Sequence, residues 1–261
     1  MNGPFASRLP PFLAGIVFLA LWEGSVRMMA VPVYILPGPL VIAETLWTDG
    51  GTLLRALGIT IGVTITALIG ATLGGALLAV LMAQSRVIER SLFPYAVAAQ
   101  VTPVVAIAPL IIIWVDDAYT SQVVLAWIVA FFPIVSNTMV GLKSADRNLA
   151  DLFGLYDAGR WQTYRLLRFP SALPYFLAGL RISGGLALIG AVVAEYVAGT
   201  GGSDVGLATR IMEAGHRLEI ARVFAGLVLL SLTGIVIYLA LDILSRRLLR
   251  HWHESAEAGP D

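Results

Sequence analysis

The feature that most constrains this chain is a series of six apolar segments, each close to or above the length of a membrane-spanning helix. They cover residues 12–30, 57–83, 91–115, 120–142, 173–198 and 221–245. A helix needs about 20 predominantly apolar residues to cross the hydrocarbon core of a bilayer, and longer segments allow for tilt. The sequence therefore predicts an all-α integral membrane protein with six transmembrane helices, formed as a single domain by residues 1–261.

Composition supports this prediction and excludes several kinds of function. Hydrophobic residues make up 58% of the chain and charged residues only 13%, about half of what a soluble domain carries. The net charge of zero gives no basic signature for nucleic acid. Cysteine is absent and the three histidines are scattered, so no metal site is expected. There is no GxxxxGK[ST] phosphate-binding motif, so we expect no catalytic residue and no cofactor bound by this chain.

The distribution of basic residues predicts an orientation. With the N-terminus in the cytoplasm, the cytoplasmic side holds more Lys and Arg than the outer side, as the positive-inside rule requires. Arg8 precedes the first apolar segment, as in a signal peptide, but Glu23 follows within it and no small-residue cleavage site is present. We interpret this segment as a retained span and predict a multi-pass protein with both termini in the cytoplasm.

The connection at residues 143–172 is long and patterned, which indicates a function. Leu149, Leu152, Phe153 and Tyr156 recur at helical spacing, with Asp146 or Asn148 in position to cap the helix. A second, basic helix is predicted from 161 to 168, ended by Pro170. The pattern fits two interpretations, a knob that docks into a groove of a partner or an amphipathic segment on the membrane, with Arg165 and Arg168 meeting lipid phosphates.

The tract DLFGLYDAGRWQTYRLLRFPSALPY, from Asp151 to Tyr175, resembles the cytoplasmic signature of the permeases of binding-protein-dependent ABC importers. The later runs Gly179-Leu180-Arg181 and 190–195 also fit, and the resemblance extends over the second to sixth segments. The chain is most similar to the nitrate/sulfonate/taurine branch, and within it to the permeases for pyrimidine-type thiamine precursors and riboflavin. The resemblance implies the type I ABC importer permease fold, with a cytoplasmic coupling-helix loop at 143–172.

Two departures from the family pattern lie in this loop. Asp151-Leu152-Phe153 stands where the family has Glu-Ala-Ala, and Asp157 stands where it usually has glycine. Glycine permits a left-handed turn at this point, and aspartate tolerates that conformation better than most residues. We therefore expect the turn to persist.

The resemblance also implies partners and a role. Two permease copies, expected to be a homodimer, would form the pathway in the lipid of the bacterial inner membrane. A cytoplasmic ABC ATPase dimer would bind ATP and Mg²⁺, and an extracytoplasmic binding protein would deliver a small polar organic solute. Our best guess for that solute is a pyrimidine-like or riboflavin-like heterocycle, with sulfonate/taurine or nitrate as the alternative. The residues that would couple to the ATPase are Asp151, Leu152, Phe153, Tyr156, Asp157, Ala158, Gly159, Arg160 and Trp161.

Polar residues inside apolar segments are costly, so they are candidates for function. We predict that Gln100, Thr102, Asn137 and Glu195 border the translocation path, although a structural hydrogen bond would also explain Glu195. The acidic residues of the first and sixth segments each precede an arginine by four positions, which favours helix-stabilising pairs.

Three rival functions fit the sequence less well than the importer. A secondary transporter would be expected to show repeated halves or an ion relay, and neither is visible. A membrane-embedded enzyme would need a cluster of catalytic side chains, which the segments do not contain. A purely structural subunit would leave the patterned loop at 143–172 without a role.

Overall fold

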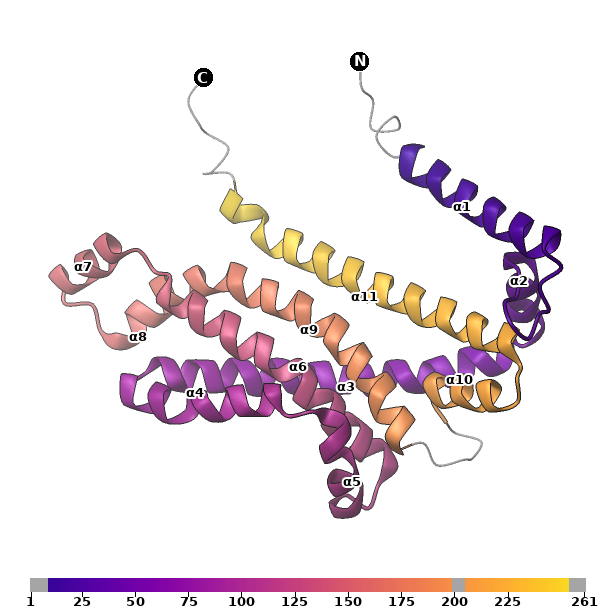
Figure 1. Cartoon of the computed structure of the whole chain (residues 1–261). Helices are drawn as coiled ribbons and strands as arrows, with labels where there is room; N and C mark the ends of the chain where they lie inside the picture. The colour runs from indigo at the N-terminus through magenta and orange to yellow at the C-terminus, as the bar shows by residue number, and fades with distance from the viewer. Residues whose placement is uncertain (1–8, 199–204, 254–261) are drawn as a thin grey trace. The chain divides into compact units, whose positions relative to one another are not determined.

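The protein, described here from a computed structural model, is helical throughout the regular structure of residues 9–198 and 205–253, which the structure describes. The elements are α1 (Leu9–Met28), α2 (Pro39–Thr48), α3 (Gly50–Ala83), α4 (Arg86–Val101), α5 (Val104–Trp114), α6 (Ala118–Lys143), α7 (Arg147–Leu155), α8 (Arg160–Thr163), the π-helical turn η1 (Tyr164–Arg168), α9 (Phe169–Ala198), α10 (Leu207–His216) and α11 (Ile220–His253) (Figure 1). The predicted all-α class is confirmed. Both termini, for which we predict a cytoplasmic location, lie outside the described residues.

Four helices in the described part of the chain are long and apolar enough to cross a membrane. They are Gly50–Ala83, Ala118–Lys143, the continuous helix Arg160–Ala198 and Ile220–Arg250. The pair α4 and α5 counts as a fifth if it forms one broken span. The first predicted segment, 12–30, falls mainly in α1, which is 20 residues long.

The third predicted segment, 91–115, is not one helix. It is broken into α4 and α5, which meet at an angle of 100°. Thr102 is extended at the break, with φ −65° and ψ 122°, and Pro103 follows it. Proline disfavours the helical conformation of the residue before it and has no N–H to continue the hydrogen-bond ladder, which explains the break at this position.

The chain divides into two compact units. Unit 1 comprises the described parts of residues 1–59 and 203–231, and unit 2 comprises those of residues 60–202 and 232–261. The long helices α3 and α11 each contribute their first part to unit 1 and the remainder to unit 2.

Small residues let α6 and α9 approach closely in the centre of unit 2. A Cβ atom on Gly179 would lie 2.8 Å from the Pro133 carbonyl oxygen, and one on Gly190 would lie 2.8 Å from the Ala126 Cα. Between these points the buried Ser183 hydroxyl donates to the Ala130 carbonyl oxygen at 2.6 Å. Close backbone approach and interhelical hydrogen bonds hold membrane helices together where lipid is as apolar as the side chains.

Two aromatic residues of α6 fill the space against α3 in unit 2. The ring centroids of Trp127 and Phe131 lie 4.8 Å apart. Their rings lie over Gly70 and Gly74 of α3, where a Cβ would be 3.3 Å from Trp127 and 3.6 Å from Phe131. The pair of glycines four positions apart in α3 therefore accommodates rings of α6.

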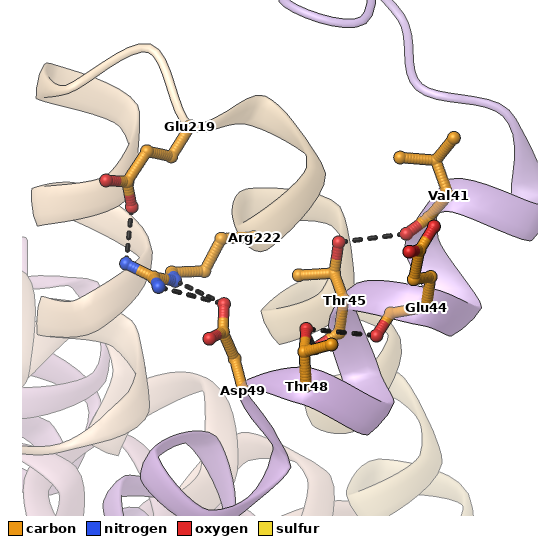
Figure 2. A network of polar contacts seen from close by, with 7 residues as sticks. All are labelled: Val41, Glu44, Thr45, Thr48, Asp49, Glu219 and Arg222. Atoms are coloured by element: carbon orange, nitrogen blue, oxygen red, sulfur yellow. Dashed lines mark hydrogen bonds and ion pairs between the residues drawn. The ribbon is translucent and has the colours of Figure 1, made fainter.

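Unit 1 is held by polar contacts at the ends of its helices. Glu23 of α1 accepts from Arg27 Nε at 2.6 Å, as the spacing predicted, and also from the Leu40 backbone N–H at 3.2 Å, at the start of α2. This carboxylate therefore serves a free N–H in the first turn of α2, which suits a negative group at a helix N-terminus. At the other end of α2, Asp49 contacts Arg222 of α11 (Figure 2).

Candidate functional site

The loop between α6 and α9 folds into the predicted two-part knob, which extends beyond the ends of these helices in unit 2 (Figure 1). Its first part, α7, begins at Asp146, whose carboxylate accepts from the backbone N–H groups of Asn148 at 2.7 Å and Leu149 at 3.3 Å. Of the two predicted caps, Asp146 is therefore the one used. This cap satisfies two of the N–H groups that a short helix leaves free at its start.

The turn after α7 has the left-handed residue that the sequence predicted. Asp157 has φ of 49°. The Ala158 N–H donates to the Phe153 carbonyl oxygen at 3.0 Å, and the Tyr156 N–H donates to that of Leu152 at 3.2 Å. The first of these bonds reaches five residues back. This is the pattern of a helix C-terminus that ends with one residue in the left-handed conformation. Aspartate thus supports the turn at the position where the family usually has glycine.

The second part of the knob differs from the prediction. Gly159 starts α8, and its N–H donates to Gln162 Oε1 at 3.0 Å. The helix does not end at Pro170, as we predicted, but continues through η1 into α9. In η1 the Phe169 N–H reaches the Tyr164 carbonyl oxygen, five residues back. In this π turn the hydrogen bond spans five residues instead of the four of an α-helix. Pro170, which has no N–H, follows directly, at a point where the α-helical hydrogen bonds are already interrupted.

An exposed apolar face covers the knob, and we call its members the docking face. They are Leu149, Leu152, Leu155, Tyr156 and Trp161. Leu155, Tyr156 and Trp161 are the most exposed, at 83%, 80% and 69%. Among the other predicted coupling residues, Phe153 and Ala158 are half-buried, while Asp151, Asp157, Gly159 and Arg160 are exposed around the face. The prediction missed Leu155, which lies three residues after Leu152 but outside the i, i+3, i+4, i+7 pattern that starts at Leu149.

Side-chain contacts tie the knob to the rest of unit 2. The Tyr164 hydroxyl donates to the Ala83 carbonyl oxygen at the end of α3, at 3.1 Å. Arg168 donates to the Tyr164 hydroxyl at 3.3 Å, and its guanidinium lies 4.9 Å from the centre of that ring. On the other side, Lys143 at the end of α6 pairs with Glu89 of α4. The knob is therefore tied to α3 by Tyr164 and is continuous with α9, and at its base α6 is paired with α4.

The four residues predicted along the translocation path are not all in one place. Gln100 and Thr102 line a cavity of about 340 Å³ at the α4–α5 break. Asn137 lies outside its lining and donates to the Pro133 carbonyl oxygen at 2.8 Å, one turn back in α6. Glu195 is fully buried in α9 and also does not line the cavity. The structure therefore joins the first two residues and separates them from the other two.

An ion-pair cluster inside unit 2 was only half predicted. Asp242 of α11 accepts from Arg246 at 2.8 Å, the pair that the spacing indicated. It also pairs with Arg181 of α9 at 2.9 Å, and the Arg181 guanidinium lies 5.9 Å from the centre of the Tyr238 ring. An arginine within the fifth apolar segment indicates that a buried partner exists. The partner, Asp242, is 61 positions away, so sequence spacing could not identify it.

Comparison with known proteins decides the family. The sequence profile of the family described as "Binding-protein-dependent transport system inner membrane component" matches residues 71–250, which include the knob. The chain belongs to this family. It is an inner-membrane permease component of an ABC importer, a class of transport subunit rather than an enzyme. The family's systems depend on a binding protein and an ATPase, which are therefore the partners of a subunit of this kind.

Relatives of known function agree with the predicted branch. The chain is 36% identical over 242 residues to the riboflavin transport system permease protein RibX of Chloroflexus aurantiacus, covering 92% of this chain and 88% of the relative. It is 35% identical over 242 residues to the formylaminopyrimidine transport permease protein ThiX of Halalkalibacterium halodurans, covering 92% and 95%. The taurine transport system permease protein TauC of Escherichia coli is 29% identical over 244 residues, covering 91% and 87%.

A solved structure shares the fold. The chain matches one titled "Crystal structure of an amino acid ABC transporter with histidines" with a TM-score of 0.65 and 16% identity, over 78% of this chain and 97% of the other. At this identity the likeness concerns the fold alone, and it supports an ABC transporter permease architecture.

Proposed function

We propose that the docking face of this permease is the surface on which a cytoplasmic ABC ATPase dimer, with its ATP and Mg²⁺, acts. The observation that carries the proposal is the exposure of Leu155, Tyr156 and Trp161 on a capped and tethered knob. Large apolar side chains displayed on a short helix fit into a groove of a partner protein, where burial of their area stabilises the complex. The predicted coupling residues Asp151 and Arg160 border this face and would contact its partner.

The alternative, a knob lying on the membrane surface, is less well supported. In that arrangement Arg165 and Arg168 would meet lipid phosphates. Arg168 is instead engaged with the ring and hydroxyl of Tyr164. The exposed carboxylates Asp151 and Asp157 beside the docking face would be repelled by an anionic leaflet.

We further propose six spans, with α1 as the first and the broken pair α4–α5 as the third, and both termini in the cytoplasm. The excess of basic residues on the knob side supports this orientation. Two identical copies would pair around the pathway, with lipid around them. The exposed apolar residues of α11, such as Ile235, Val236 and Leu239, would face lipid or the second copy.

For the substrate we propose a small, polar heterocycle of the riboflavin or pyrimidine type, delivered by an extracytoplasmic binding protein. The relatives named for riboflavin and formylaminopyrimidine transport, at 36% and 35% identity, support this class. A sulfonate, taurine or nitrate is the second candidate, because relatives named for the transport of each also match.

The docking proposal is tested by a paired substitution on the knob. Leu152→Asp with Trp161→Ala should abolish co-purification of the partner ATPase and ATP-dependent uptake, while the permease inserts at normal levels. The matched control is Leu218→Asp with Trp47→Ala, which changes the same residue types at exposed positions of unit 1 and should retain the ATPase. If the knob variant keeps the ATPase and transports normally, the docking face is not the coupling surface.

A further inference from the structure

The cavity at the α4–α5 break is lined by residues that have no role in the docking of the ATPase. Its lining comes from the break itself, from α6 and from α9, all within unit 2. The residues are Ala99, Gln100, Val101, Thr102, Pro103, Val104, Ile128, Val129, Pro133 and Leu186. A volume of about 340 Å³ is at the lower end of the range of small-molecule sites. None of these ten side chains carries a charge.

Two polar side chains in this lining have different roles. The Thr102 hydroxyl donates to the Ala98 carbonyl oxygen at 2.7 Å, so its proton is already used at the end of α4. The Gln100 carboxamide is exposed at the cavity lining, and no hydrogen bond from it to another side chain or backbone group is found among the described residues. A carboxamide has two N–H donors and one acceptor oxygen. In an apolar segment that enters the membrane, these groups cost free energy unless they find hydrogen-bond partners.

The backbone at the break adds neutral hydrogen-bonding groups. Pro103 has no N–H, so the Ala99 carbonyl oxygen lacks the donor that a continuous helix would supply at that position. The cavity thus combines apolar walls from Ile128, Val129 and Leu186 with an accessible carboxamide and a carbonyl that has no helical donor at position 103. Apolar walls with a few placed polar groups are the usual form of a site for a small organic molecule.

We propose that this cavity binds a neutral, planar heterocycle through a lactam or amidine edge held by the Gln100 carboxamide. A lactam pairs its N–H and C=O with the oxygen and nitrogen of one carboxamide, and its ring faces pack on the apolar walls. This inference rests on the proposed importer function and names the substrate class of its pathway.

An inorganic or sulfonate anion is a poor match for the same lining. Removing a full charge from water is costly unless a charged or strongly donating group replaces the lost hydration. The N-terminus of α5 offers about half a positive charge, and no Lys, Arg or His is among the described residues that line the cavity. The cavity therefore selects against nitrate and sulfonate, whichever solute the binding protein captures.

The test uses the complete permease–ATPase complex in lipid nanodiscs, without the binding protein. Equilibrium binding is measured for two neutral probes, riboflavin and hydroxymethylpyrimidine, and for two anions, nitrate and ethanesulfonate, at constant ionic strength. We expect at least one neutral probe to bind saturably and neither anion to bind. Gln100→Leu and the isosteric Gln100→Glu should weaken binding of that probe by about tenfold or more, since each removes the donor.

The matched control is Gln122→Leu, on α6 but outside the cavity lining, which should bind within about twofold of wild type. Binding of either anion more tightly than both heterocycles overturns the proposal. So does the absence of heterocycle binding, or unchanged binding by Gln100→Leu, in a complex that retains its ATPase. Loss of the ATPase from the wild-type preparation would instead contradict the docking function proposed above, so the two failures are distinguishable.

Discussion

Arg222 donates from Nε and Nη2 to a single carboxylate oxygen of Asp49, at 2.9 and 2.8 Å, across 173 positions of sequence (Figure 2). The remaining Nη1 of Arg222 pairs with Glu219, three residues earlier and directly before α11. One guanidinium therefore joins the turn between α2 and α3 to the first turn of α11. Both carboxylates converge on it in Figure 2, which makes this a small network rather than an isolated pair.

The network predicts a modest loss of stability when Asp49 is neutralised. Asp49→Asn keeps the shape of the turn but removes the charge, and we expect the free energy of unfolding to fall by about 1 kcal/mol, because both side chains are about one third exposed. Thermal unfolding in detergent measures the change. Arg55→Gln, at an exposed arginine of unit 1 without an ion pair in the described residues, should leave the midpoint unchanged. An equal fall of the thermal midpoint in both variants would show that the loss of any surface charge, rather than the loss of this contact, lowers stability.

The close packing of α6 and α9 predicts opposite results at two glycines of one helix. A methyl group at Gly179 would lie 2.8 Å from the Pro133 carbonyl oxygen, whereas one at Gly185 would meet nothing within 4 Å. Gly179→Ala should therefore destabilise unit 2 by about 1–3 kcal/mol through overpacking, and Gly185→Ala should be tolerated. Yield and thermal midpoint of the two purified variants provide the comparison, and a stable Gly179→Ala protein would mean that the helices can separate at low cost.

We expect the free energy of unfolding to depend on both members of the Arg181–Asp242 pair. Arg181→Leu leaves Asp242 with the exposed Arg246 as its only counter-charge among its contacts, and should destabilise by about 1–3 kcal/mol. The double variant Arg181→Leu with Asp242→Leu should recover most of this loss, since no unpaired charge remains. Equilibrium unfolding of the single and double variants forms the cycle. Simple additivity of the two losses would show that the groups do not interact.

The left-handed turn of the knob predicts that residue 157 controls coupling through backbone shape. Asp157→Gly should preserve ATPase binding and stabilise the turn by a few tenths to about 1 kcal/mol, because glycine adopts positive φ freely. Asp157→Val should weaken binding, since a β-branched residue at φ of 49° costs about 1–2 kcal/mol. Co-purification of the ATPase at increasing salt ranks the three proteins. Equal retention by the valine variant would exclude a role for this conformation.

A pH effect is expected at the connection between α5 and α6. The Thr120 hydroxyl and the Thr120 backbone N–H both donate to Asp117 and lower its pKa below the ordinary 3.8. A lowered pKa means that the carboxylate contributes stability above that ordinary value, and that the contribution is lost as pH falls through the folded-state pKa below it. Asp117→Asn should therefore reduce stability at neutral pH, and the difference from wild type should disappear once the pH is below the folded-state pKa of Asp117. Asp116→Asn serves as the control, and a pH-independent difference between Asp117→Asn and wild type would contradict the assignment.

The parts of the fold that were predictable are those set by local sequence. Apolar length located the long helices, and helical spacing with an Asp cap located α7. The conformation of Asp157 followed from the residue types that tolerate positive φ. Each of these depends on a few neighbouring residues, so it can be inferred without knowledge of the tertiary structure.

The features that were missed depend on partners far away in the chain or on hydrogen-bond register. Proline normally kinks a membrane helix, so nothing local distinguished the 100° break at Pro103 from a kink. Pro170 was expected to end a helix, but the π turn before it accommodates the ring. Arg181 finds Asp242 only because α9 and α11 meet, whereas the Arg246 pair was readable from its spacing.

The uninterrupted path from α8 through η1 to the end of α9 has a mechanical consequence. Its 39 residues, at about 1.5 Å each, form a rod of roughly 58 Å, about twice the thickness of the hydrocarbon core. A rod that pivots near its middle converts a tilt of about 5° at the knob into an opposite displacement of about 2.5 Å at its far end, given that length. A small rotation of a docked partner would therefore be transmitted across the whole membrane by leverage, with no need for side chains to relay it step by step.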